Sequence, residues 1–237
     1  MKNSSSKLAV MQPYFFPYAG YFQLIMAVDT FVFYDDVCFI KGGWINRNRI
    51  LIDGESKFLT IPCRKASQNK LINKIHHALD DKMRVKLINK VKSAYGNAPH
   101  FSKVFPVFEE VISSEYSLVS ELAIQSIRKT TDYLGLSKNF KISSETYDNR
   151  NLGGSERIVD ICKKEKTTVY VNPVGGRELY DEDDFNMFGL ELKFLQHELA
   201  EYPQFKNKFV PGLSILDVLM FNSKPEIRSM LKDYSIR

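Results

Sequence analysis

Lys7-Leu-Ala-Val-Met-Gln12, followed at once by Pro13, is the stretch of sequence that decides the fold. It is a short apolar run that ends at a proline, which is typical of a buried strand that leads into a loop. The next stretch, Gly20–Val28, has the pattern of a helix, and Thr30–Tyr34 (TFVFY) is a second apolar run. The order strand, loop, helix, strand predicts an α/β fold.

The rest of the chain continues in alternating elements. Trp44–Ile52 and Lys57–Pro62 flank the turn Asp53-Gly54, which predicts a β-hairpin. Between about residues 81 and 135 apolar residues recur every three or four positions, with breaks near 96–100 and 113–116, so we predict three helices there. A strand near 140–142, a helix near 155–164, a strand at 167–171 and a last helix at 213–219 follow. We expect a single α/β domain over 1–237 with a mostly helical insertion at about 81–135.

Composition narrows the class of protein. Hydrophobic residues make up 44% and charged residues 26% of the chain, which is ordinary for a globular protein. The net charge of +5 suits a phosphate-bearing partner without identifying nucleic acid. The three cysteines are widely spaced, the four histidines show no metal spacing, and no stretch approaches the roughly twenty apolar residues of a membrane span. We expect a cytoplasmic protein with no membrane span and no metal site.

The loop after the first strand is the first candidate site. Pro13 and Pro17 hold it extended, and Gly20 stands at the helix entrance, where backbone can approach an anion closely. Tyr18-Ala-Gly-Tyr21 resembles the His-x-Gly-His motif of nucleotidylyltransferase-like folds, with both histidines replaced. That resemblance implies a nucleotidylyltransferase-like (Rossmann-like) sheet with an added hairpin and a helical insertion. Tyrosines there could orient a phosphate or donate a proton. We predict Tyr21 as catalytic and Gln12, Tyr18 and Gly20 as substrate-binding.

A second constellation follows the second strand. Asp35 and Asp36 stand at the strand end, and carboxylates can bind an amine, a ribose or Mg²⁺. A glycine pair then precedes cationic and amide side chains, which can bind phosphates. Arg49 is equally consistent with a solvated strand face. We predict Asp35 and Asp36 as catalytic, and Lys41, Trp44, Asn46, Arg47 and Asn48 as substrate-binding.

Later segments offer weaker candidates. Gly175-Gly176 beside Arg177 could cradle a diphosphate, although a plain loop fits equally well. His100 is the best general base among the histidines. Ser214 is expected to cap the last helix, with Asp217 completing a capping box, and the alternative is that this segment closes the site together with Tyr202–Gln204.

These motifs together resemble the signature of the WbqC-like proteins. The resemblance runs through Gln12-Pro13, Pro17, Gly20-Tyr21-Phe22, Val28-Asp29, Tyr34-Asp35-Asp36-Val37, Lys41, Trp44, Asn46-Arg47-Asn48, Leu59–Pro62, Tyr95 with Asn97-Ala98-Pro99, and Phe209–Asp217. It therefore covers nearly the whole chain. Members of the family are typically found in gene clusters for O-antigen and other bacterial surface polysaccharides, which implies a role in making or decorating an activated sugar.

The resemblance and the residues together suggest a transferase. We predict transfer of an acyl or aminoacyl group to the amino group of a nucleotide-linked amino sugar. Gly20, Lys41 and Arg47 would hold the diphosphate, and Asp35 or Asp36 would bind or deprotonate the amine. No cofactor signature is legible, and a charged tRNA as aminoacyl donor and a homo-oligomer both stay open. The alternatives are a non-catalytic sugar-nucleotide-binding or assembly partner, with aromatics from Tyr14 to Tyr18 as its interface, and a nucleotidylyltransferase-like enzyme.

Overall fold

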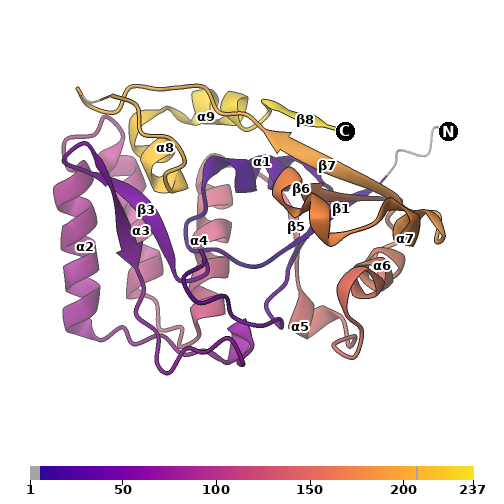
Figure 1. The fold of residues 1–237 in the computed structure, drawn as a ribbon. Coiled ribbons are helices and arrows are strands. Elements are labelled where there is room, and N and C mark those ends of the chain that lie inside the picture. Colours follow the sequence, from indigo (N-terminus) through magenta and orange to yellow (C-terminus); the bar gives the residue numbers. More distant parts are fainter. Residues whose placement is uncertain (1–5, 207) are drawn as a thin grey trace.

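A six-stranded sheet forms one side of the molecule, and three helices with a hairpin form the other (Figure 1). The computed structural model describes residues 6–206 and 208–237. The sheet order is β5-β2-β1-β6-β7-β8, and all neighbours are parallel except β7 and β8. The strands are β1 Lys7–Met11, β2 Thr30–Phe33, β5 Asn139–Ile142, β6 Val169–Pro173, β7 Glu191–His197 and β8 Tyr234–Ile236.

The order of the parallel strands places β1 at the centre of the sheet. Numbered along the chain, the five parallel strands lie in the order 3-2-1-4-5, as in a Rossmann sheet. The winding direction reverses between β1 and β6. In open sheets of this kind, ligands bind outside the carboxyl ends of the strands at such a reversal. The predicted α/β fold is thus confirmed as a mixed α/β structure with a mostly parallel sheet.

Helices cover both faces of the sheet, because neighbouring residues of a strand point to opposite sides. Ala9 of β1 packs into the core that holds helix α1 (Ala19–Ala27), whereas Leu8 and Val10 pack with helix α6 (Gly154–Lys164). The connections that follow β1 therefore lie on one face, and those around β6 lie on the other. Helix α7 (Glu182–Asn186) joins α6 on the second face.

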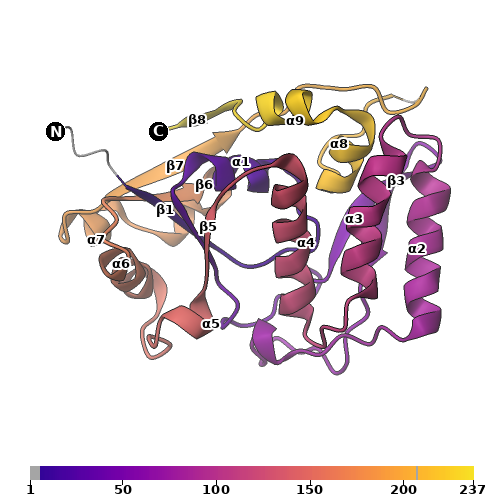
Figure 2. The same ribbon diagram turned by 180° about the vertical axis from the view of Figure 1, so that it is seen from behind.

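The hairpin and three long helices form the second half of the molecule (Figure 2). Strands β3 (Arg47–Ile52) and β4 (Glu55–Thr60) are joined by Asp53 and Gly54, whose φ angles are 52° and 77°. Both positive values fit the type I′ turn that Asp-Gly favours. Helices α2 (Asp81–Tyr95), α3 (Phe101–Ser113) and α4 (Val119–Leu134) begin and end close to the predicted breaks.

The C-terminal part holds elements that the sequence did not predict. Helix α8 (Ile215–Phe221) corresponds to the predicted last helix, but β7, β8, α7 and α9 (Lys224–Met230) were not expected. Strand β7, ELKFLQH, carries charged and polar residues because it lies near the sheet edge. Shorter elements are α5 (Ser143–Thr146) and 3-10 turns at Ile72–Lys74 and Val174–Leu179. Within 6–206 and 208–237, no helix is long and apolar enough to cross a membrane.

Candidate functional site

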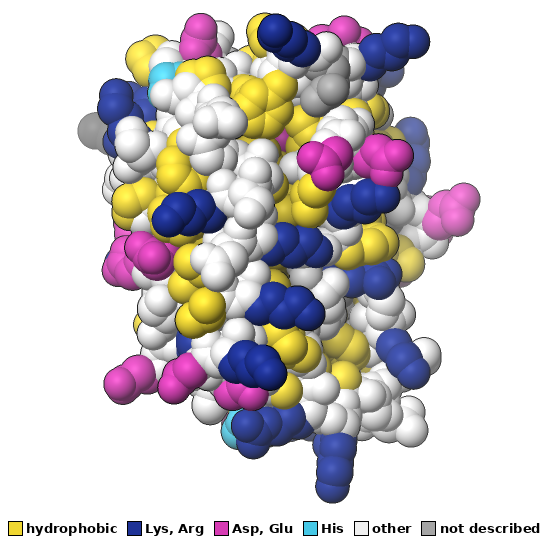
Figure 3. All heavy atoms as spheres, turned by 90° about the vertical axis from the view of Figure 1, so that its left-hand side faces the viewer, with side chains coloured by type: hydrophobic (Ala, Val, Ile, Leu, Met, Phe, Trp, Pro, Cys, Tyr) yellow, Lys and Arg dark blue, Asp and Glu magenta, His cyan; other side chains and the backbone are white. Residues whose placement is uncertain are grey.

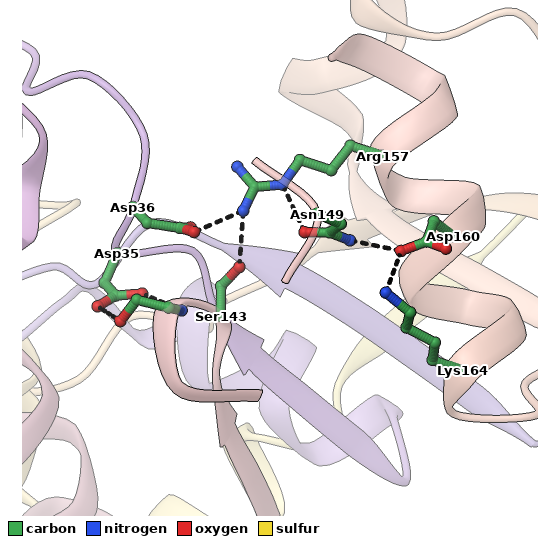
Figure 4. Close-up of polar contacts among 8 residues, drawn as sticks. Asp35, Asp36, Ser143, Asn149, Arg157, Asp160 and Lys164 are labelled. Atoms are coloured by element: carbon green, nitrogen blue, oxygen red, sulfur yellow. Dashed lines mark hydrogen bonds and ion pairs between the residues drawn. The ribbon is translucent and has the colours of Figure 1, made fainter. Parts of the chain in front are cut away.

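The candidate site lies where β1 and β2 end, next to the start of α6 (Figure 4). The chain continues beyond β2 through Tyr34 to Asp35 and Asp36, and both aspartates are only 3% exposed. Helix α6 returns across the sheet from β5 to β6, so its first turn lies at the carboxyl edge. The site is thus at the edge where the strand order predicts ligand binding.

A buried ion pair between Asp36 and Arg157 forms the centre of the site. One amino group of Arg157, Nη2, donates to Asp36 Oδ2 at 2.6 Å and to Ser143 Oγ at 3.2 Å. Nε donates to Asn149 Oδ1 at 2.9 Å, and the guanidinium carbon lies 4.7 Å from the centre of the Tyr34 ring. The side chains of Arg157 and Asp36 are 4% and 1% exposed. Such a pair holds both groups in one orientation, since losing either partner would leave a buried charge.

Asp35 faces a different set of partners. Its Oδ1 accepts the Ser144 backbone N–H at 3.0 Å, and its Oδ2 accepts the Ser144 hydroxyl at 2.6 Å. Its carbonyl oxygen accepts the N–H of Asn73 at 3.0 Å. Asp35 therefore ties the start of α5 and the 3-10 turn at Ile72–Lys74 to the end of β2.

Three acceptor oxygens at this edge are buried without a hydrogen-bond donor among the described residues. They are Asp36 Oδ1, Asn73 Oδ1 and Gln12 Oε1. Gln12 directly follows β1, and Asn73 is bonded to Asp35. A buried acceptor without a donor costs free energy, so this group of atoms is suited to receive N–H or O–H groups of a ligand.

The start of α6 offers hydrogen-bond donors, whereas the three oxygens above are acceptors. Gly153 is the N-cap, and no side chain in 6–206 or 208–237 caps the helix, so its first N–H groups are available to an anion. A Cβ at Gly153 or Gly154 would meet no atom of the described part of the chain within 4 Å, so a ligand could approach this helix start. Burial raises the pKa of the nearby Tyr34, which therefore stays protonated at neutral pH.

The sequence of the chain is similar to that of a known protein family. The model of the WbqC-like protein family matches residues 12–229. The chain belongs to the WbqC-like family. The uncharacterized protein Rv1507c of Mycobacterium tuberculosis is 29% identical to it over 233 residues, which are 95% of this chain and 97% of that relative. No solved structure matches the chain significantly.

In this WbqC-like chain, buried polar side chains hydrogen-bond to the backbone of the loop between Gln12 and Tyr18 and fix its conformation. Phe16 has a φ of 39°, a strained value for a residue other than glycine. Asn48 Nδ2 and Ser214 Oγ donate to its carbonyl at 2.8 and 2.7 Å, and Ser126 Oγ accepts its N–H at 2.8 Å. Asn48 is 3% exposed. We had predicted Asn48 to bind substrate, but its amide is used to shape the loop.

The Tyr18–Tyr21 motif also has structural partners. Tyr21 is 1% exposed, and its hydroxyl donates to the Gln12 carbonyl at 2.9 Å. Burial raises its pKa well above 10, so the predicted catalytic proton donor is in fact a core residue. A Cβ at Gly20 would lie 2.6 Å from the Tyr18 ring and 2.8 Å from His197. Glycine is therefore required there for helix packing, whereas we had expected it to admit a ligand.

The aromatics proposed as a protein interface are largely inside this WbqC-like protein. Phe15 and Phe16 are 1% and 0% exposed, and Tyr14 and Tyr18 are half-buried. Burial, together with the neighbouring Tyr18, raises the pKa of Tyr14 to about 12. The prediction of an exposed aromatic interface is wrong for this loop.

The remaining predicted residues are not brought together with Asp36. Arg47 donates to the Gly43 carbonyl and Asn46 donates to Ile61 at 2.8 Å, so both side chains bond to backbone next to the hairpin. Lys41 is exposed, and the Trp44 ring lies 6.3 Å from the Phe58 ring of β4. Arg177 lies in the 3-10 turn that follows β6, and its guanidinium carbon is 5.4 Å from the centre of the Phe194 ring in β7.

His100 does not join the aspartates either. It donates its backbone N–H to the carbonyl of Met220 in α8, at 3.0 Å. In Figures 1 and 2 the two helices α8 and α9 lie at the end of the molecule opposite α5, which Asp35 contacts. His100 therefore stays a predicted base, and the described residues show no hydrogen bond between it and Asp35 or Asp36.

Asp217 belongs to a separate buried network. Ser214 caps α8 as predicted, but the Asp217 side chain does not complete a capping box. It accepts hydrogen bonds from Tyr95 at 2.8 Å and from Tyr202 and Gln204 at 2.7 Å each. These three partners are buried, so the network holds Tyr202 and Gln204 against α8.

Sequence reasoning missed Arg157, Asn149, Ser143 and Asn73. Arg157 lies one turn into an amphipathic helix, a position that is usually exposed, so its burial carries no local signal. The one available hint was Gly153-Gly154 before a helix that follows a strand.

Proposed function

We propose that this WbqC-like protein is a cytoplasmic enzyme of bacterial surface polysaccharide biosynthesis that transfers an acyl or aminoacyl group to the amino group of a nucleotide-linked amino sugar. The observation that supports it best is Asp36: one carboxylate oxygen is held by Arg157, and the other is buried with no hydrogen-bond donor among the residues that the structure describes. An amine supplies the N–H donors that this oxygen lacks.

Each part of the substrate has a counterpart in the site. The diphosphate would meet the N–H groups at the start of α6, and the sugar hydroxyls and amine would meet Gln12, Asn73 and Asp36. In the reaction the amine nitrogen attacks the acyl carbonyl, the bond from the acyl group to its carrier breaks, and the amine loses a proton. In this proposal Asp36 Oδ1 orients the amine and accepts that proton, while the hydrogen bond from Arg157 fixes the orientation of the carboxylate.

Ligand binding tests the proposal directly. We would measure thermal unfolding with UDP- and dTDP-linked amino sugars, with the matching sugars that carry a hydroxyl instead of the amine, and with ATP and Mg²⁺. A ligand at a hundred times its Kd stabilises the protein by roughly 2.7 kcal/mol. We expect the amino sugars to stabilise most. Equal binding of the hydroxyl sugars would refute the role of Asp36, and binding of ATP with Mg²⁺ alone would favour nucleotidyl transfer.

A pair of variants locates the amine. Asp36→Asn should weaken binding of the amino sugar at least roughly tenfold and leave binding of UDP itself unchanged, because the proposed diphosphate contacts at α6 do not involve Asp36. The variant also leaves Arg157 without its carboxylate partner, so a thermal melt is needed to show that the fold is intact. Asp132→Asn on the surface of α4 is the control and should bind as the parent does. Failure of every sugar nucleotide to bind would move the assignment to a non-catalytic assembly partner.

A further inference from the structure

Positive charge is concentrated in one part of the chain. Residues 41–93 contain thirteen lysines and arginines against four aspartates and glutamates, a formal charge of +9, whereas the whole chain carries +5. The rest of the chain is therefore net negative. The segment builds the hairpin β3–β4, the 3-10 turn and α2. Figure 3 views the molecule from this side and shows a column of lysine and arginine side chains with hydrophobic atoms between them.

Flat rings and guanidinium groups alternate on the hairpin. Arg47 lies 4.3 Å from the centre of the Phe58 ring, and Arg49 lies 5.4 Å from the Trp44 ring. The two rings are 6.3 Å apart. Arg49 is directly opposite Phe58 in the strand register, which puts both on one face. Phe58 is 43% exposed, although phenylalanine is usually buried.

A groove continues this face between the hairpin turn and α2. It has a volume of about 730 Å³ and is lined by Asp53, Lys90, Asn97, Phe205 and Lys206 among others. Lys90 joins the two features, because its Nζ donates to the Phe58 carbonyl at 2.8 Å. Phe205, at the far side, is 41% exposed. Exposed rings thus lie at both ends of a surface that lysines line.

We propose that this hairpin and α2 face binds a single-stranded segment of RNA. Single strands are bound by aromatic rings on which bases stack and by cations that follow the phosphates, and this face offers both. Duplex RNA presents its phosphates and hides its bases, so it would leave Trp44 and Phe58 unused. The face does not include Asp36 or α6, so the inference is independent of the proposed function.

The experiment uses Trp44, which is the single tryptophan of the chain. We would titrate the full-length protein with a 20-nucleotide unpaired RNA and follow its intrinsic fluorescence. Stacking should quench Trp44, and binding should weaken as salt rises, with a slope of log K against log salt of about −0.7 for each phosphate contacted. Inorganic polyphosphate of equal charge, duplex RNA and vesicles of anionic phospholipid are the comparison ligands.

Matched variants separate this surface from general electrostatics. Phe58→Ala should weaken RNA binding roughly tenfold, since one stacked base is worth that much or more. Phe188→Ala is its control, because Phe188 is 50% exposed and lies under Lys163 at 3.6 Å, the same kind of pair outside this face. Lys86→Glu should weaken binding, and Lys163→Glu should weaken it less.

The outcomes are distinct. Quenching by unpaired RNA that is lost in Phe58→Ala and kept in Phe188→Ala supports the proposal. Equal binding of polyphosphate, preference for duplex, binding of vesicles in place of RNA, or a Phe58→Ala variant that binds as the parent does would each overturn it. Matching thermal melts of all variants show that the fold is intact.

Discussion

Tyr95→Phe removes one oxygen atom that bridges two buried groups. The Tyr95 hydroxyl accepts the backbone N–H of Leu51 at 2.9 Å and donates to Asp217 Oδ2 at 2.8 Å. Tyr95 and Asp217 are both 0% exposed, and Leu51 is 1% exposed, so water cannot replace the lost partner. The substitution therefore leaves an N–H of β3 and a carboxylate oxygen without partners while the ring packing is kept.

The magnitude follows from those two losses. A buried group without a partner costs about 1–3 kcal/mol, and a hydrogen bond to a charged group is worth about 1.5–3 kcal/mol. Because both losses share one hydroxyl, we expect about 2–5 kcal/mol in the free energy of unfolding. For a chain of this size, each kcal/mol lowers Tm by about 2–4 °C. Urea unfolding followed by circular dichroism measures the change, provided that the m-value is unchanged.

The control and the pH dependence sharpen the test. Tyr133→Phe removes a hydroxyl for which the structure shows no hydrogen bond to a described residue, so it should cost less than about 0.5 kcal/mol. Burial raises the pKa of Asp217, and the hydrogen bond from Tyr95 opposes that rise. A carboxyl whose pKa is higher in the folded than in the unfolded state stabilises the fold at low pH, where it is protonated. That contribution is lost as pH rises through the folded pKa, because the carboxylate is then buried with a charge. The hydrogen bond from Tyr95 matters most for the charged form. The cost of Tyr95→Phe should therefore be smaller at pH 4 than at pH 7. A cost near zero at both would refute the reasoning.

Three further substitutions probe the site and its supporting loop. Arg157→Met should lower the free energy of unfolding by about 3–5 kcal/mol in urea, because it leaves the Asp36 carboxylate buried and unpaired, and a change below about 1 kcal/mol would contradict the buried pair. Gly20→Ala should lower the free energy of unfolding by about 1–3 kcal/mol through overpacking. Gly175→Ala should be nearly neutral, because a Cβ there meets no described atom within 4 Å. Equal Tm values for the two variants would argue against close packing at Gly20. Asn48→Asp puts a carboxylate oxygen against a backbone carbonyl and should lower Tm more at pH 7 than at pH 4, which a thermal melt at the two pH values checks.

Much of the secondary structure was predictable because it depends on local pattern. Strands β1 and β2, the Asp53-Gly54 hairpin and the helices α2 to α4 all lie close to their expected bounds. Strand β7 was missed because polar and apolar residues alternate only from Glu191 to Phe194 before Leu195 breaks the pattern. Helix α9 was missed because its seven residues are too few for a clear helical period.

The candidate site was predictable only in part. Asp35 and Asp36 stood out as paired carboxylates after a strand, and the carboxyl edge of a parallel sheet is where such residues gather. Tyr21, Gly20 and Asn48 also stood out because they belong to motifs. In the structure Tyr21 and Asn48 hold the loop in place, and Gly20 allows close packing of α1. A motif shows that a residue matters to the structure or the function, and it does not separate the two.

The sequence by itself determined the α/β class, the hairpin, the three-helix segment and the resemblance to the WbqC-like family, because these depend on residue order and short-range spacing. Only the tertiary structure decided that Arg157 is the partner of Asp36, a contact across 121 positions of the chain, and that Asp217 is held by Tyr95 and Tyr202. Such pairings form because a polar group that folding removes from water costs free energy unless it bonds to another polar group. Nothing in the local sequence records which groups will meet.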